Sequence, residues 1–142
     1  MAEIYFFKED IKFDLRKLKR HKAWLNTLAI SHGYQISELN YIFCSDKYLH
    51  KINVEYLDHD TYTDIITFDL REDPRNHFSL ESDIYISVER VLENASTRGL
   101  DMKEELSRVM AHGLLHLMGK KDKTAIEKQE MRLAEDKALE LF

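Results

Sequence analysis

Several features that define specialised classes of protein are scarce in this chain. Its 142 residues include one cysteine, one proline and four glycines. Cys44 stands alone in the apolar run YIFC and cannot form an internal disulfide, so we expect a core residue in a reducing compartment. The sequence shows no linker, internal repeat or low-complexity tract. We therefore expect residues 1–142 to form a single domain.

Long apolar runs and an excess of positive charge are also lacking. No stretch approaches the roughly 20 apolar residues of a membrane helix, and the start MAEIYFFKED lacks the basic-then-apolar pattern of a signal peptide. A cytoplasmic location without membrane association is the expectation. The formal net charge of −5 argues against a protein that coats nucleic acid through bulk charge, while local basic clusters can still bind phosphate.

The pattern of apolar residues predicts an α+β fold. Short runs rich in β-branched and aromatic residues indicate strands, and longer amphipathic segments indicate helices. Ser45 and Ser87 are expected helix N-caps, and residues 71–78 are expected to form a loop. Strands are predicted at residues 4–7, 39–44, 62–68 and 82–86, and helices at 13–32, after Ser45, from Ser87 to Gly99, after the capping box Asp101/Glu104 and after the capping box Thr124/Glu127.

The segment HGLLHLMGKKD, residues 112–122, has the spacing of a metal site. His112 and His116 lie one helical turn apart, so both imidazoles can reach one ion. Gly119 can end the helix and reverse the chain, which brings Asp122 back toward the histidines. A histidine pair alone is more often an ordinary surface feature, but the glycine and the third ligand are independent constraints. We predict one divalent metal, zinc first, with an open position for water.

Two basic clusters bear on what the site could bind. The run at residues 16–22 is interpreted as a solvated helix face. Lys120, Lys121 and Lys123 flank the predicted ligands, where a polyanionic substrate would lie.

The same ligand spacing occurs in the HExxHxxGxxH zinc peptidases, so a minimal peptidase is an alternative. In those enzymes the glutamate that follows the first histidine is the general base. Here that position is Gly113, which has no side chain to act as a base. The peptidase interpretation therefore ranks low.

The histidine motif resembles the signature of the YbeY family of metal-dependent endoribonucleases, which are rRNA maturation factors. Resemblance extends over residues 49–122. The resemblance implies a mixed four-stranded sheet, a single-strand-specific RNA hydrolase that acts in ribosome assembly, and RNA in a ribosome context, ribosomal proteins included, as the partner. The residues that carry it are His112, Gly113, Leu115, His116, Leu117 and Gly119, then Asn53, Tyr56, Asp60, the strand TDIITF at 63–68, and Ser82, Asp83, Ile84 and Ile86.

Two positions depart from the family pattern. Asp122 stands where the family usually has a third histidine ligand, and a carboxylate is also a zinc ligand. Leu57 stands where the family usually has an arginine that could bind phosphate. Arg71, Arg90 and Arg108 are conceivable substitutes, although each is interpreted as a surface charge. No catalytic residue beyond the three ligands is assigned.

Leu57 also motivates an alternative outside the enzymes. A ribosome-associated binding module could use the metal as a structural link between two helices. Loss of such a metal should lower the melting temperature sharply, whereas loss of a catalytic metal should leave the fold largely intact.

Overall fold

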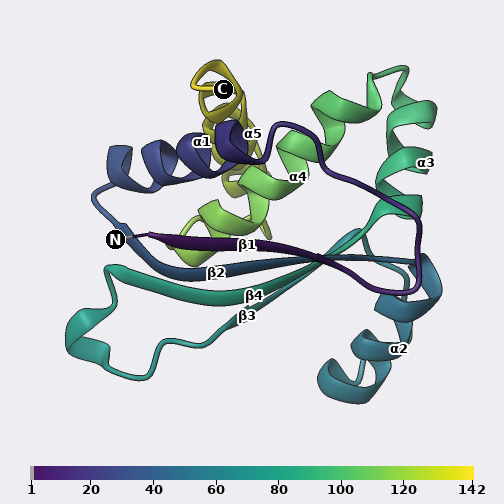
Figure 1. Cartoon of the computed structure of the whole chain (residues 1–142), viewed down its shortest axis with the longest axis horizontal. Coiled ribbons are helices and arrows are strands. Elements are labelled where there is room, and N and C mark those ends of the chain that lie inside the picture. Colours follow the sequence, from purple (N-terminus) through teal and green to yellow (C-terminus); the bar gives the residue numbers. More distant parts are fainter. Residues whose placement is uncertain (1) are drawn as a thin grey trace.

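One mixed four-stranded sheet lies at the centre of the computed structural model, which describes residues 2–142 (Figure 1). The spatial order is β1 (Glu3–Lys8), β2 (Gln35–Cys44), β4 (Ser79–Ser87) and β3 (Ile65–Asp69). β1 and β4 both run parallel to β2, and β3 runs antiparallel to β4. The predicted α+β class with a mixed four-stranded sheet is thus confirmed.

α1 (Leu18–Ser31) and α4 (Met102–Leu117) pack on one face of the sheet, and α5 (Ala125–Glu140) lies on the same side and packs against α4 (Figure 1). α2 (Asp46–Leu57) lies on the other side, next to β3 and β4, and α3 (Val88–Arg98) packs against α4. A short 3₁₀ turn, η1 (Pro74–Asn76), lies within the predicted loop between β3 and β4. None of the helices at residues 2–142 is long and apolar enough to cross a membrane.

α4 is the central helix, because its apolar stripe faces the sheet. The residues of this stripe are each at most 5% exposed: Leu106, Val109, Met110, Leu114 and Leu117. The hydroxyl of Tyr41 on β2 donates to the Met110 carbonyl at 3.0 Å, which satisfies a buried polar group between sheet and helix. α4 is therefore held in a fixed position on the sheet.

The predicted caps define where the helices begin. Ser45 and Ser87 accept hydrogen bonds from the backbone N–H groups at the starts of α2 and α3. Thr124 and Glu127 form the predicted capping box of α5. Asp101 caps α4, but it accepts from Lys103 N rather than making the predicted box with Glu104. The segment between α4 and α5 is thus fixed at both ends.

Four predicted starts are wrong by three or more residues: those of the first helix, β2, β3 and β4, of which β4 begins at Ser79 rather than at 82. The first helix begins at Leu18 rather than at residue 13, because Phe13 leaves the helix to pack against Phe43, with ring centroids 5.0 Å apart. β2 begins at Gln35 rather than at 39, with a register irregularity between Ile36 and Glu38. β3 begins at residue 65 rather than 62, since Tyr62 stacks on His50 instead of joining the sheet.

Candidate metal centre

The two histidines lie on the border of the core. α4 carries His112 and His116 one turn apart, and their ring centroids are 4.6 Å apart. Their side chains are 23% and 36% exposed, so each ring has one packed side and one open side. This agrees with the prediction that both rings project from one helical face.

Asp122 is brought to the histidines by the turn that ends α4. Gly119 has φ of +92°, in the left-handed region, and Lys120 N donates to the Leu115 carbonyl at 3.0 Å. After this reversal Asp122 Oδ2 lies 3.3 Å from His112 Nε2 and 3.3 Å from His116 Nε2. The turn places the three residues together as the spacing predicts.

The three side chains fit a divalent metal ion. Their ligand atoms all lie within 4.8 Å of one another. In a tetrahedral site with bonds of about 2.0–2.1 Å, ligand atoms stand about 3.3 Å apart, which is the separation of Asp122 from each imidazole. Two imidazoles and one carboxylate leave a fourth position for water, as catalytic zinc sites do.

Glu135 on α5 orients the first histidine. His112 Nδ1 lies 2.6 Å from Glu135 Oε2, and because an ionised carboxylate only accepts, the nitrogen is the donor. This fixes the tautomer and leaves Nε2 free to face Asp122. Arg108 donates to the other Glu135 oxygen at 3.1 Å and to Asp136 at 2.7 Å. A buried chain of charges therefore links α4 and α5 behind the predicted ligands.

The same contacts govern protonation of the histidine. Burial lowers the pKa of His112. The hydrogen bond and negative charge of Glu135, together with the charge of Asp122, raise it by more than burial lowers it, so the pKa of His112 lies above its usual value. Burial also raises the pKa of the Asp64 carboxyl, against the opposing charge of His112. Without a bound cation, His112 therefore tends to hold a proton.

Glu135 was not singled out from the sequence. The last helix carries several apolar side chains that lie outside its buried face: Ile126, Leu133 and Leu141 are 69%, 55% and 45% exposed. The buried residues of this helix are Met131, Ala134, Glu135 and Ala138. A glutamate within the buried row of a helix is rare unless paired, so the correct helical phase would have identified it.

The interpretation of three arginines as surface charges is wrong. The side chains of Arg71, Arg90 and Arg108 are only 17%, 27% and 12% exposed. Arg71 pairs with Asp69, and Arg90 with Asp46. Each guanidinium is therefore already held by a carboxylate, and none of the three lines the groove in which Leu57 lies.

The ligand trio lies where two hollows meet. A groove of about 840 Å³ contains all three predicted ligands and is lined by Leu57 at the end of α2 and by Thr61 and Thr63 between α2 and β3. Of the three lysines predicted beside the site, Lys123 lines this groove, and Lys120 and Lys121 are not among its lining residues.

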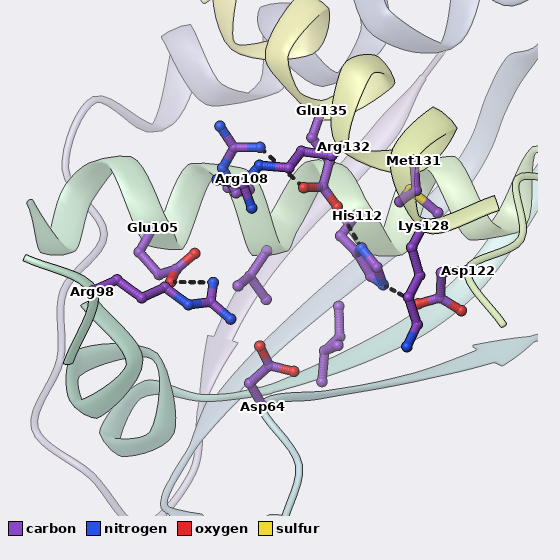
Figure 2. Close-up of a pocket in the computed structure, with 12 residues that line it drawn as sticks. Asp64, Arg98, Glu105, Arg108, His112, Asp122, Lys128, Met131, Arg132 and Glu135 are labelled. Carbon is purple, nitrogen blue, oxygen red and sulfur yellow. Dashed lines mark hydrogen bonds and ion pairs between the residues drawn. The ribbon is translucent and has the colours of Figure 1, made fainter. Parts of the chain in front are cut away.

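A second hollow, of about 420 Å³, lies between α3, α4 and α5 (Figure 2). Its walls include Asp64 and several cations that the sequence analysis did not assign to the site: Arg98, Lys128 and Arg132. Figure 2 shows the ion pair of Arg98 with Glu105 at one end and Asp122 at the other.

Gly113 explains why no glutamate follows the first histidine. The residue is buried between α4 and the sheet, and a Cβ added there would lie 2.8 Å from Ile65 Cδ1 and 3.3 Å from both Ile84 Cγ2 and Thr67 Oγ1. Any side chain at this position therefore requires Ile65 to shift, and it would start on the side of α4 that packs on the sheet. This packing disfavours the glutamate of the peptidase arrangement.

Known proteins are similar to this chain over nearly its whole length. Residues 3–142 match the family described as Endoribonuclease YbeY. The chain is 54% identical over 138 residues to Endoribonuclease YbeY of Cytophaga hutchinsonii, which covers 97% of this chain and 94% of that relative. It is 48% identical over 134 residues to Endoribonuclease YbeY of Amoebophilus asiaticus, covering 94% of this chain and 89% of the relative.

One solved structure has the same fold. The solution structure of TM1509 from Thermotoga maritima matches with a TM-score of 0.69 at 25% identity, covering 97% of this chain and 87% of that chain. Sequence similarity over residues 3–142 and the shared architecture lead to one conclusion: the chain belongs to the YbeY family.

Proposed function

We propose that this chain is a metal-dependent endoribonuclease that hydrolyses phosphodiester bonds in single-stranded RNA. The observation that carries the proposal is the placement of His112, His116 and Asp122 at metal-ligand distances in an open groove. The relatives' name, Endoribonuclease YbeY, supplies the class of substrate. Zinc suits the donor set and the tetrahedral spacing, and we propose it as the ion.

The residues of the chain divide the work of such a site. His112, His116 and Asp122 would hold the ion, and Glu135 orients His112 so that Nε2 faces the ligand position. When bound, a divalent ion supplies polarisation of a phosphate oxygen and a water of lowered pKa. Lys123 lines the groove and contributes a cation for the RNA backbone. The threonines and Leu57 form the wall against which nucleotides would lie.

We also propose the biological setting. Ribosomal RNA is the substrate that the resemblance to rRNA maturation factors implies, encountered in the ribosome context and with ribosomal proteins nearby. Such a role would place the protein in the cytoplasm, with residues 1–142 acting as one domain.

The test compares the wild type with His116→Ala on ribosomal RNA and on matched single-stranded and duplex oligonucleotides. Metal content is measured for each preparation, and His32→Ala, which changes an exposed histidine at the end of α1, is the control. We expect His116→Ala to lose both metal and cleavage while His32→Ala retains both. Equal cleavage by all three proteins would point to a contaminating nuclease and overturn the proposal.

A second function has one observation in its favour. Asp122 precedes α5 while both histidines lie on α4, so a metal would join the two helices as a structural link. The predicted difference is thermal: removing a structural metal lowers the melting temperature sharply. We expect only a modest decrease, because the buried faces of α4 and α5 and the Arg108–Glu135 pair already join the two helices.

A further inference from the structure

Two cations on α5 face the second hollow without a partner. Lys128 and Arg132 both line it, and in the part of the chain that the structure describes neither side chain makes a hydrogen bond or ion pair. They stand at i and i+4, so they project from one face of the helix. Both residues are exposed, as on an ordinary solvated helix face, and what distinguishes them is that they line the hollow beside His112 and Asp122.

We propose that Lys128 and Arg132 form a phosphate-binding subsite for the RNA strand beside the scissile bond. The inference rests on the proposed function and extends it to residues that position the substrate. It assigns the strand a path from the groove, past the three ligands and into the hollow between α3, α4 and α5.

The two hollows are continuous at the ligands. Four residues line both of them, namely Asp64, Ile65, His112 and Asp122. Figure 2 shows Lys128 extending on the side of the hollow where Asp122 lies. A strand that passes from the groove across Asp122 into the hollow would therefore run beside these α5 cations.

The charges of the hollow leave Lys128 and Arg132 available for phosphate. Glu105 is paired with Arg98 at 3.1 Å, and Glu135 is held by both Arg108 and His112. Asp122 faces the two imidazoles as a metal ligand. Of the remaining lining groups, Asp64 is the one carboxylate outside these pairs. Two unpaired cations thus face one unpaired carboxylate, and a bound divalent ion adds further positive potential.

The groove on the other side of the ligands lacks an equivalent pair. Leu57 lines it where the family pattern has an arginine, and Lys123 is the one lysine or arginine among its lining residues. Arg71 and Arg90 are held by Asp69 and Asp46. The positive charge that a phosphate backbone requires is therefore concentrated on α5.

The test uses the double substitution Lys128→Ala/Arg132→Ala and the charge-retaining Lys128→Arg/Arg132→Lys. The control is Lys19→Ala/Lys137→Ala, which removes two exposed cations outside both hollows. Binding of a single-stranded 2′-O-methyl oligonucleotide is measured by fluorescence anisotropy from 50 to about 300 mM salt. Steady-state cleavage, metal content and melting temperature are measured on the same proteins.

We expect the α5 double variant to bind at least about tenfold more weakly, since each cation makes a charged hydrogen bond to phosphate. The slope of log K against log salt should fall by about 1.4, that is, about 0.7 for each phosphate contact on a single strand. KM should rise more than kcat falls, and metal content should not change. The charge-retaining variant should keep most of the slope, and the control should keep nearly all of it.

The two hypotheses fail in different ways. If the wild type cleaves RNA but the α5 double variant matches the control in slope and KM, the subsite is refuted and the nuclease stands. If the wild type binds the oligonucleotide with the expected slope but no preparation cleaves RNA, the nuclease is refuted and the subsite stands as an RNA-binding surface. If the charge-retaining variant loses the slope as fully as the alanine variant, the effect is structural and the subsite is refuted.

Discussion

The two sides of α4 are held by different interactions. The side that faces the sheet is apolar and so closely packed that a carbon atom added at Gly113 would require the Ile65 side chain to shift. The side that faces α5 is a chain of charges in which Glu135 holds both Arg108 and His112. On the side facing the sheet, the space available limits which side chains fit. On the side facing α5, each charged group requires a partner of opposite charge. Packing on the sheet therefore fixes the position of α4, and Glu135 orients His112 and raises its pKa.

The largest effect is expected from a substitution that disrupts the packing of α4 on the sheet. Gly113→Glu forces a side chain into the contact with Ile65 and buries a carboxylate, so it should lower the free energy of unfolding by about 3 kcal/mol or more. Urea denaturation measures it. Lys103→Glu adds the same group at an exposed position of α4 and should cost little. A stable Gly113→Glu protein would show that the helix can move away from the sheet.

The next largest effect is expected from loss of the negative charge that pairs with Arg108 and His112. Glu135→Gln leaves Arg108 and His112 without their anion, so metal affinity should fall by about 10- to 100-fold and stability by about 1–3 kcal/mol. Metal competition titration and thermal melting measure the two quantities. Glu130→Gln, on the exposed face of α5, is the control. Unchanged affinity in Glu135→Gln would mean that α4 alone orients His112.

A third substitution tests whether the groove binds RNA less strongly because it lacks a cation at Leu57. Leu57→Arg places a cation in the groove and should strengthen RNA binding by about two- to fivefold, the size of an exposed charge contact. Val54 is also on α2 and, like Leu57, is 40% exposed, but it does not line the groove. Equal gains for Leu57→Arg and Val54→Arg in an anisotropy titration would mean that only overall charge matters.

The smallest effect is expected at Asp69, a more exposed carboxylate than Glu135. Asp69 pairs with Arg71 but is 48% exposed, so Asp69→Asn should cost only about 0.5 kcal/mol at neutral pH. The hydrogen bonds and charge of Arg71 lower the pKa of Asp69 in the folded protein. Its stabilisation is therefore present above the unfolded pKa of about 3.9 and is lost as the pH falls through the lower folded value.

Denaturation of the wild type and Asp69→Asn from pH 7 to about pH 2 checks this sign. The difference between the two proteins should shrink only below about pH 4. A constant difference across the range would mean that the carboxylate contributes through geometry alone.

The ligand trio could be predicted because its determinants are local. His112 and His116 share a helical face by periodicity, and Gly119 reverses the chain at a fixed distance from Asp122. The buried stripe of α4 and the caps at Ser45, Ser87 and Thr124 are local for the same reason. Strand and helix starts were less accurate, since Phe13 and Tyr62 follow tertiary contacts rather than propensity.

The sequence by itself determined the α+β class, the grouping of His112, His116 and Asp122 and the family pattern, because periodicity, capping and motif spacing act over a few residues. Only the tertiary structure decided that Glu135 orients His112, that Arg108 is an internal partner rather than a surface charge, and that Lys128 and Arg132 line the same hollow as His112 and Asp122. Those relations join α4 to α5 across a distance set by side-chain packing, which local sequence does not encode.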